Sequence, residues 1–486
     1  MHERFDVVIV GAGFSGLGVA CHLQRQCPDL SFVLLDEQAS FGGTWRTHRF
    51  PGARSDSDLH TYGFRFKPWS GPAVATSEQI LDYLGAVIGE NGLAPHIRYG
   101  HRVEQASWSS DTNTWTVRAR SEGKGDRSFD ARFLLLCQGY YRHDAGYRPS
   151  WPGMDTFEGP IVHPQTWPED LDYRGKRVVV IGSGATAATI VPAMAGEAAH
   201  VTMLQRSPTY YASVGYTLPM ADVLRALGVS DWWLHEIAKW RVLREEASFM
   251  RRIRRDPDAV ARDLIADVRA RLPEGFDIEK HFTPSHRPWQ QRLCYVPDGD
   301  LFTAIRKGAV SMATGEIARL TPKGIELTTG ETICADVIVT ATGLSLSALG
   351  DIAITVDGRP IVPGETLTWH GMMLEGVPNL AFVFGYLRSS WTLRVDLVAD
   401  VVCRLLNHMR SHGLAKVAPR RRAEDEAMEI GPWVPRGDFD PGYIARGGHL
   451  FPKRGDRPEW QHSHDYWIDK DRLPAIQPSD STLAYG

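Results

Sequence analysis

The sequence predicts an α/β protein with two nucleotide-binding units, the second of them interrupted by helices. Near residues 5–23 and 176–187, an apolar run, a glycine-rich turn and a helical pattern follow one another in the same order. Between about 215 and 275 the apolar residues recur at helical spacing instead. A chain of 486 residues is also too long for one ordinary core, so more than one domain is expected.

The first unit begins with the apolar run at 5–10, which is typical of a strand buried on both faces. Gly11, Gly13 and Gly16 follow at once in the spacing G-x-G-x-x-G, before a helical pattern. Such a turn brings backbone close to a pyrophosphate at a helix N-terminus. The next strand delivers Asp36, where a carboxylate accepts hydrogen bonds from ribose hydroxyls. Together these features predict a Rossmann-like dinucleotide-binding domain.

The second unit repeats this order with a different ending. The strand at 176–181 enters a turn with Gly182, Gly184 and Ala187 in the variant G-x-G-x-x-A. Thr186, within the same turn, is a further candidate cofactor contact. The following strand ends in Arg206 and not in an acid. A guanidinium binds a 2′-phosphate through two hydrogen bonds, whereas a carboxylate repels it. We therefore expect FAD or NAD in the first site and NADPH in the second; the alternative for Arg206 is a solvated surface arginine.

Two dinucleotide sites in one chain imply a flavin that is reduced by a nicotinamide, so FAD and NADPH are the expected cofactors. The predicted fold has two Rossmann-like domains, one for FAD and one for NADPH, with a helical insertion in the NADPH domain. The apolar runs 131–141 and 335–343, each ending near a glycine, are expected to carry the chain between the domains. The predicted segments are 1–145 (FAD), 146–207 (linker and NADPH), 208–285 (insert), 286–342 (NADPH) and 343–486 (FAD and C-terminal tail).

Helical spacing within the insert connects Trp233, Ile237 and Trp240, and Pro257 is expected to separate two helices. We interpret the tryptophans as core packing and expect the insert to cap the active site. The basic run 251–255 is interpreted as a solvated helix face, in preference to a patch for a membrane or an acidic partner.

Charge and cysteine content argue against several other classes of protein. The formal net charge of −4 gives no reason to expect nucleic acid or an anionic membrane as a partner. The six cysteines form no C-x-x-C pair and no zinc-finger spacing, so neither a metal nor a redox-active dithiol is expected. No secretory signal or apolar run of bilayer length is found, and we expect a cytoplasmic protein.

Two longer motifs are more specific than the glycine turns. The pattern [AG]-G-x-W-x4-[FY]-P-[GM]-x3-D is met within 41–58 by Gly42, Gly43, Trp45, Phe50, Pro51, Gly52 and Asp56. The pattern F-x-G-x3-H-x3-W-[PD] is met between the two units by Phe157, Gly159, His163, Trp167 and Pro168. With both motifs in this order, the chain resembles the type I Baeyer–Villiger monooxygenases, which are class B flavoprotein monooxygenases.

This resemblance implies an activity. NADPH would reduce FAD, O2 would then form a C4a-peroxyflavin, and one oxygen atom would be inserted next to a ketone carbonyl to give an ester or lactone. Arg292 falls where the family has its active-site arginine, and Asp56 where a carboxylate holds that arginine in place. A fixed cation favours the anionic peroxide that attacks a carbonyl.

Other site residues follow from the same resemblance. Thr44 and its neighbours Gly43 and Trp45 are candidate cofactor contacts, and Trp391 resembles a residue near the bound nicotinamide. The linker motif with His163 is thought to couple domain rotation to turnover. Each assignment has a structural alternative: Asp56 could cap a turn, Arg292 could form a surface ion pair, and the linker and tryptophan side chains could fill core.

Three other functions remain to be weighed. A flavin monooxygenase that oxygenates sulfides, thioamides or amines shares both glycine turns, but its relatives usually lack the long fingerprint and carry Tyr or Phe in place of Trp167. A flavin-dependent dithiol reductase needs a proximal cysteine pair, which is absent from the sequence. A non-catalytic flavin-binding protein would not consume NADPH. The expected partners are therefore O2 and a small ketone or sulfide.

Overall fold

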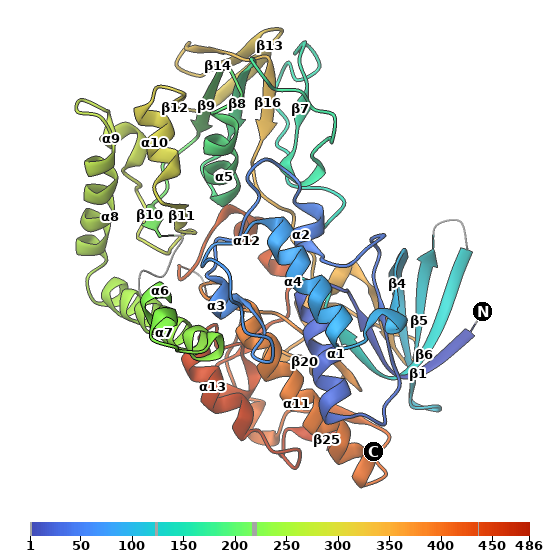
Figure 1. Cartoon of the computed structure of the whole chain (residues 1–486). Coiled ribbons are helices and arrows are strands. Elements are labelled where there is room, and N and C mark those ends of the chain that lie inside the picture. Colours follow the sequence, from blue (N-terminus) through green and yellow to red (C-terminus); the bar gives the residue numbers. More distant parts are fainter. Residues whose placement is uncertain (1, 122–124, 216–220, 436) are drawn as a thin grey trace.

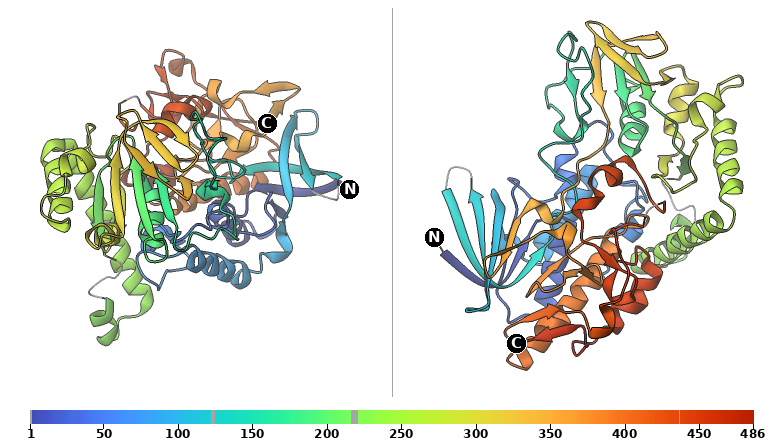
Figure 2. Two further views of the ribbon diagram at one scale, coloured as in Figure 1. Left: turned by 90° about the horizontal axis from the view of Figure 1, so that it is seen from above. Right: turned by 180° about the vertical axis from the view of Figure 1, so that it is seen from behind.

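The computed structural model describes residues 2–121, 125–215, 221–435 and 437–486. A mixed sheet and a parallel sheet lie in separate lobes that meet at the centre of the molecule (Figures 1 and 2). The predicted α/β class with two Rossmann-like domains is confirmed. Residues 216–220 of the predicted insert lie outside the described residues.

The first sheet has nine strands in the order β18-β17-β4-β5-β6-β1-β2-β3, with β21 also paired to β6. The strands are β1 (His2–Val10), β2 (Phe32–Leu35), β3 (Ile97–Arg98), β4 (His101–Ser109), β5 (Thr114–Ser121), β6 (Gly125–Leu136), β17 (Ala353–Val356), β18 (Arg359–Ile361) and β21 (Leu380–Phe382). Helices α1 (Phe14–Gln26), α4 (Ser77–Glu90) and α11 (Thr392–Ser411) contribute buried apolar side chains to one core beside this sheet. Both faces of β1 and β2 are therefore covered, as their apolar sequences require.

The second sheet is parallel throughout, in the order β12-β9-β8-β16-β7. Its strands are β7 (Ile161–Val162), β8 (Arg177–Ile181), β9 (His200–Gln205), β12 (Val310–Thr314) and β16 (Val337–Thr340). Val178 and Val180 pack in one core with α5 (Ala185–Met194) and α10 (Asp300–Arg306), whereas Val179 and Ile181 pack in another with a three-stranded sheet. That small sheet consists of β13 (Ile317–Thr321), β14 (Gly324–Leu327) and β15 (Thr332–Cys334). Alternate side chains of β8 thus face opposite sides of the sheet.

The insert contains α6 (Ala221–Ala226), α7 (Asp231–Arg255), α8 (Pro257–Arg271) and α9 (Ile278–Phe282). Strands β10 (Tyr211–Val214) and β11 (Cys294–Pro297) pair with each other at its two ends. Pro257 is the first residue of α8, so the prediction that it separates two helices is confirmed. The four arginines of 251–255 are exposed, and Arg252 pairs with Asp263 (2.5 Å).

The interpretation of the insert tryptophans as core packing is wrong. Trp233 is 58% exposed and Trp240 is 40% exposed, and Ile237 on the same side of α7 is 43% exposed. Helical spacing predicts that residues share a face, but it does not tell which face meets the core. In α7 the buried positions are Leu234, Ala238 and other residues of the opposite side.

The chain after residue 415 returns to the first lobe. Strand β22 (Val417–Pro419) pairs with β25 (Leu483–Tyr485), and β23 (Ile430–Gly431) pairs with β24 (Arg454–Gly455). Helix α13 (Tyr466–Ala475) packs on α11, where Arg394 and Asp469 form a buried ion pair. Helix α12 (Gly442–Gly447) lies apart from α13, between the two lobes (Figure 1). Shorter elements elsewhere are α2 (Thr44–Thr47), α3 (Leu59–Tyr62), β19 (Thr368–Trp369) and β20 (Met373–Leu374).

The chain passes from the first sheet to the second between β6 and β7, and returns between β16 and β17. On the strength of these two crossings, we propose the five segments predicted above as the domain boundaries. Throughout the described ranges, no helix is both long and apolar enough to cross a bilayer. Nor do the described residues bring three or more His, Cys, Asp or Glu together as a metal site.

Replacing Gly16 with alanine tests the first glycine turn. A Cβ atom at position 16 would lie 1.8 Å from the Gly11 carbonyl oxygen, so we expect Gly16→Ala to lower the free energy of unfolding by about 3 kcal/mol. Gly89→Ala is the matched control, because nothing lies within 4 Å of a Cβ in that part of α4. The free energy of unfolding of this control should stay the same or rise by up to about 1 kcal/mol. Urea unfolding measures both, and equal stability of the two variants would contradict this account.

Candidate active site

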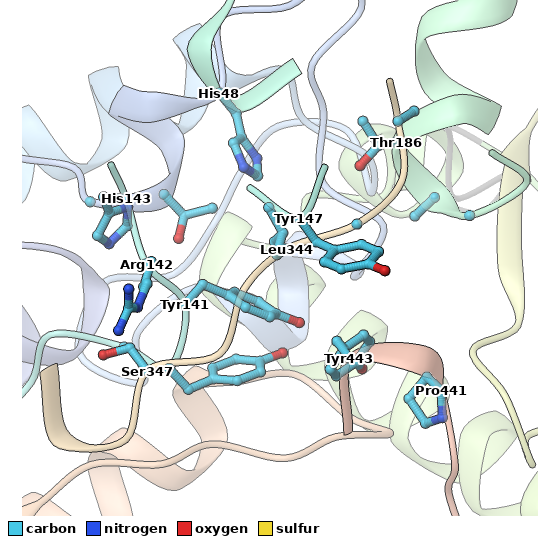
Figure 3. A pocket seen from close by; sticks show the side chains of 18 of the residues that line it. His48, Tyr141, Arg142, His143, Tyr147, Thr186, Leu344, Ser347, Pro441 and Tyr443 are labelled. Atoms are coloured by element: carbon cyan, nitrogen blue, oxygen red, sulfur yellow. The ribbon is translucent and has the colours of Figure 1, made fainter. Parts of the chain in front are cut away.

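A cavity of about 910 Å³ lies between the two lobes (Figure 3). It is lined by both glycine turns, by helix α12 and by the first fingerprint, which is the motif that runs from Gly42 to Asp56. Its lining includes these predicted site residues: Gly11, Gly13, Asp36, Gly43, Thr44, Trp45, Asp56, Gly182, Gly184, Thr186, Arg206, Arg292 and Trp391. The cavity therefore brings together groups that are far apart in the sequence. Gly16 lies beneath the turn, against Gly11.

The first glycine turn forms a cradle that fits a dinucleotide. Gly11 has a φ of +102°, and a Cβ there would lie 2.7 Å from the Cys137 carbonyl oxygen, so only glycine fits without strain. Gly13 immediately precedes α1, and nothing lies within 3.5 Å of where its Cβ would be. This space is what a pyrophosphate at a helix N-terminus needs.

Asp36 lies beside this cradle, directly after β2. Its carboxylate accepts hydrogen bonds from the backbone N–H groups of Ala12 (2.6 Å) and Gln38 (2.8 Å). Burial raises its pKa, and the two N–H groups oppose that rise by stabilising the anion. The carboxylate is thereby held at the edge of the cavity, in a position that fits ribose hydroxyls.

The second cradle has the same construction. Gly182 has a φ of +133°, and its Cβ would lie 2.3 Å from the Ala341 carbonyl oxygen. Gly184 precedes α5 and has open space around it. Thr186 and Arg206 border the same part of the cavity. Arg206 is exposed and follows β9, as a group that contacts the far end of a dinucleotide should.

Arg292 and Asp56 form an ion pair across the cavity, with 2.6 Å between Nη2 and Oδ2. Their side chains are 33% and 30% exposed, so both remain open to the cavity. The carboxylate of Asp56 raises the pKa of Arg292 above its usual value, which keeps the guanidinium charged. The structure thus brings together two residues that the sequence linked only through a resemblance.

Three tyrosines that sequence reasoning missed surround this ion pair: Tyr140, Tyr141 and Tyr443. The rings of Tyr140 and Tyr141 have centroids 3.9 Å apart, and the edge of Tyr443 faces Tyr141 at 5.9 Å. Figure 3 shows Tyr141, Tyr443 and the nearby Tyr147 at the cavity. Burial raises the pKa of Tyr443, so its hydroxyl stays protonated. Tyr140 and Tyr141 are the last two residues of the predicted crossing run 131–141, a signal that could have found them; Tyr443 lies in no motif.

The first fingerprint connects the two lobes. At one end, the Cα atom of Gly13 lies 3.4 Å from where a Gly43 Cβ would be, so two glycine backbones meet there. At the other end, a Cβ on Gly52 would lie 2.6 Å from the Cβ atom of Ala193 in α5. Phe50 is buried in the core of the second lobe, beside α5. The motif therefore fixes the position of Asp56 relative to both glycine turns.

The linker motif makes internal contacts and does not line the cavity. His163 is 5% exposed; its Nε2 donates to the Gly343 carbonyl (3.1 Å) and its Nδ1 accepts from the Gln165 N–H (3.2 Å). Burial lowers the pKa of His163, which keeps the ring neutral as these two bonds require. Phe157, Gly159 and Trp167 pack against neighbouring core residues. These contacts match the structural alternative for the linker.

Trp391 lies at the cavity on the side of the first glycine turn. Its indole N–H donates to the Ser15 hydroxyl (2.7 Å) in α1, and its ring stacks on Tyr140 with 5.1 Å between centroids. A Cβ on Gly385 would lie 2.4 Å from the indole, which shows how closely it is packed. Trp391 therefore lies beside the first glycine turn, and its place near a bound nicotinamide stays a prediction.

Within the predicted insert 208–285, Pro208 and Thr209 line the cavity, but no described residue of helices α6 to α9 does. The helices of the insert therefore do not cap the cavity in this structure. The insert instead contacts a cavity-lining segment from behind: Ser389 donates to the Glu246 carboxylate of α7 (3.0 Å). Burial raises the pKa of Glu246 to about 7.

Comparison with known proteins agrees with this geometry. The sequence model of the flavin-binding monooxygenase-like family matches residues 4–225. The FAD-containing monooxygenase EthA of Mycolicibacterium smegmatis is 45% identical over 471 residues, which cover 96% of this chain and 94% of the relative. The chain belongs to the flavin-binding monooxygenases.

Other members of this family match as fully. The putative FAD-containing monooxygenase MymA of Mycobacterium tuberculosis is 44% identical over 491 residues, covering 100% of this chain and 98% of the relative. The probable FAD-binding monooxygenase AlmA of an Acinetobacter species is 41% identical over 494 residues, covering 100% and 97%. The likeness therefore extends through the C-terminal segment that contains α12.

Two solved structures share the fold. Cyclohexanone monooxygenase from Rhodococcus sp. Phi1 bound to NADP+ has a TM-score of 0.78 and 23% identity, covering 100% of this chain and 99% of that one. A steroid monooxygenase bound to NADP has a TM-score of 0.77 and 24% identity, covering 99% of both chains. At these identities the match shows a common two-domain architecture.

The contact between Glu246 and Ser389 predicts a pH dependence of stability. Because the folded-state pKa of Glu246 is above its ordinary value of 4.5, the stability it contributes is full below pH 4.5 and is lost as pH rises through 7. The loss is at most about 3.5 kcal/mol, at roughly 1.4 kcal/mol per pKa unit. We expect Glu246→Gln to weaken the decline in melting temperature between pH 5.5 and 8.

The control for this measurement is Glu245→Gln, because Glu245 is exposed and pairs with Arg241 on the outer side of α7. Its pH profile should follow that of the unchanged protein. Identical profiles for the Glu246 and Glu245 variants would show that Glu246 does not titrate in this range.

Proposed function

We propose that this flavin monooxygenase inserts one oxygen atom of O2 next to the carbonyl of a small ketone and gives an ester or lactone. One observation carries the proposal: a permanently charged arginine, held by Asp56, faces the cavity that joins two dinucleotide cradles. FAD and NADPH are the cofactors, in line with the FAD-containing relatives and the NADP-bound structures. Bound FAD, reduced by NADPH, supplies the electrons that activate oxygen.

Each cradle has residues suited to one cofactor. Gly11, Gly13 and Asp36 would hold the pyrophosphate and ribose of FAD, with Gly43, Thr44 and Trp45 close by in the cavity. Gly182, Gly184 and Thr186 would hold the pyrophosphate of NADPH. Arg206 would bind its 2′-phosphate, since a guanidinium pairs with a phosphate through two hydrogen bonds.

Arg292 would stabilise negative charge on the oxygen that is transferred. A guanidinium suits this task because it does not lose its proton at working pH. Asp56 serves as a positioning residue, because its 2.6 Å contact holds the guanidinium in one place without neutralising it by proton transfer. Negative charge on the attacking oxygen favours addition to a carbonyl carbon.

Oxygenation of a sulfide, thioamide or amine is the second candidate activity. In this reaction the oxygen that is transferred must carry a proton. The phenols of Tyr140, Tyr141 and Tyr443, which lie beside Arg292, would supply that proton. Burial raises the pKa of all three, so they carry their protons at neutral pH. The balance between Arg292 and these phenols would set the ratio of the two activities.

The role of Arg292 is tested by Arg292→Ala with FAD bound. We expect NADPH to reduce the flavin at a near-normal rate, while ester formation falls by about 100-fold or more. Arg292→Lys, which retains a charge, should recover part of this loss. The measurement is aerobic turnover across a ketone and sulfide panel, with products identified by mass spectrometry and hydrogen peroxide quantified.

Arg287→Ala is the matched control, because Arg287 lies five positions earlier, is exposed and does not line the cavity. It should leave the product ratio unchanged. Normal ester yield from Arg292→Ala would remove Arg292 from the reaction.

The coenzyme assignment is tested by Arg206→Asp. Removing the guanidinium and adding a repelling carboxylate should lower kcat/KM for NADPH by about 100-fold, with little effect on NADH. Stopped-flow measurement of flavin reduction by each coenzyme gives both values. Equal kcat/KM for NADPH and NADH in the unchanged enzyme would contradict the assignment.

A further inference from the structure

Helix α12 brings a second arginine to the cavity. Pro441, Gly442, Tyr443 and Arg446 all line it, although they belong to the C-terminal segment. The guanidinium of Arg446 lies 3.5 Å from the centre of the Tyr147 ring, which borders the same cavity. A stack of this kind holds a flat cation in a fixed orientation.

Arg446 and Arg206 line the same cavity. Partial burial lowers its pKa, and the neighbouring charge of Arg206 lowers it further. Among the described residues, no carboxylate forms an ion pair with either guanidinium. Two cations that converge on a cavity without a counter-ion repel each other, and the repulsion is relieved when an anion binds between them. The two arginines together therefore form a site for a doubly charged group such as a phosphate.

The same helix reaches the catalytic arginine. Tyr443 lies three residues before Arg446, so the two side chains share one side of α12. The Tyr443 ring faces Tyr141, and its buried hydroxyl forms no well-aligned hydrogen bond with the described residues, although Tyr141 and Arg292 are both close enough to lower its pKa. The positive charge of Arg292 acts on this phenol and partly offsets the rise in its pKa. Tyr443 thus lies beside both Tyr141 and Arg292.

The segment before α12 is attached to the loop that carries Arg292. The backbone N–H of Asp440 donates to the Gln290 carbonyl (2.7 Å), two residues before Arg292. After the helix, a Cβ on Gly447 would lie 2.9 Å from the Leu346 Cβ atom, so α12 packs closely on the return crossing. A shift of α12 would therefore displace both the loop that carries Arg292 and the crossing between the lobes.

We propose that Arg446 is the second ligand of the 2′-phosphate of NADPH, opposite Arg206, and that α12 transmits coenzyme binding to Arg292 through Tyr443. The proposal rests on the use of NADPH proposed above. The Gly182 turn would hold the pyrophosphate, and Arg206 and Arg446, which line the same cavity, would together hold the 2′-phosphate. With Arg446 drawn toward the phosphate, α12 holds the Tyr443 hydroxyl against the guanidinium of Arg292.

Equilibrium binding to the FAD-loaded protein tests the ligand role without turnover. Calorimetry gives the Kd of NADP+ and of NAD+, which differ only in the 2′-phosphate. We expect Arg446→Met to weaken NADP+ binding roughly 10- to 100-fold, the value of one charged hydrogen-bonded contact, and to leave NAD+ binding within about twofold. The Kd of NADP+ for Arg446→Lys should lie between the values for the unchanged protein and for Arg446→Met.

Arg262→Met on α8 is the matched control, because Arg262 is exposed and lies outside the cavity. It should change neither Kd. Unchanged NADP+ binding by Arg446→Met, or an equal loss for NADP+ and NAD+, would overturn the ligand role. If the unchanged protein itself binds NADP+ and NAD+ equally, the proposed NADPH specificity fails as well, so the two failures are distinguishable.

Hydrogen–deuterium exchange tests the transmission by α12. In the unchanged holoenzyme, NADP+ should slow exchange in peptides that cover 437–447 and 286–293, whereas NAD+ should not. Arg446→Met should abolish this protection, and Tyr443→Phe should keep it at 437–447 but reduce it at 286–293. Protection at 286–293 that persists in both variants would show that α12 does not act on Arg292.

Discussion

The ion pair between Arg292 and Asp56 is the contact on which the site depends. Arg292 precedes β11 at the end of the insert, and Asp56 belongs to the fingerprint of the first lobe, 236 positions away. Neither residue is fully buried, so the pair avoids the large desolvation cost of an interior salt bridge. The cation is in place only while the two lobes keep their relative position. Phe50 and Gly52, packed on α5, provide that positioning from the same fingerprint.

Much of the fold follows from local patterns in the sequence. Each glycine turn with its strand and helix could be predicted, because close backbone contacts such as Gly16 to Gly11 permit only glycine. The position of Arg206 after its strand follows from the same logic. These constraints operate within a few residues or within one βαβ unit, so a single sequence contains them.

Contacts between distant segments are harder to predict. Arg292 could be associated with Asp56 only through family resemblance, since no periodicity connects them. Tyr443 and Arg446 lie in a six-residue helix without a motif, and their importance depends on where the C-terminal segment passes between the lobes. The exposure of Trp233 is a second example of a feature that the sequence does not predict, because helical spacing does not define which side of α7 is packed.

The hydrogen bond from His163 to Gly343 has a mechanical consequence. It links the connection that leaves the first lobe to the connection that returns to it, so the two connections are held together at this point. If one connection slid along the other, this buried hydrogen bond would break, whereas it would survive if both connections bent together. A hinge motion that keeps this bond must move both connections together. Because the imidazole is neutral, that hinge should keep the same stiffness across the ordinary range of cellular acidity.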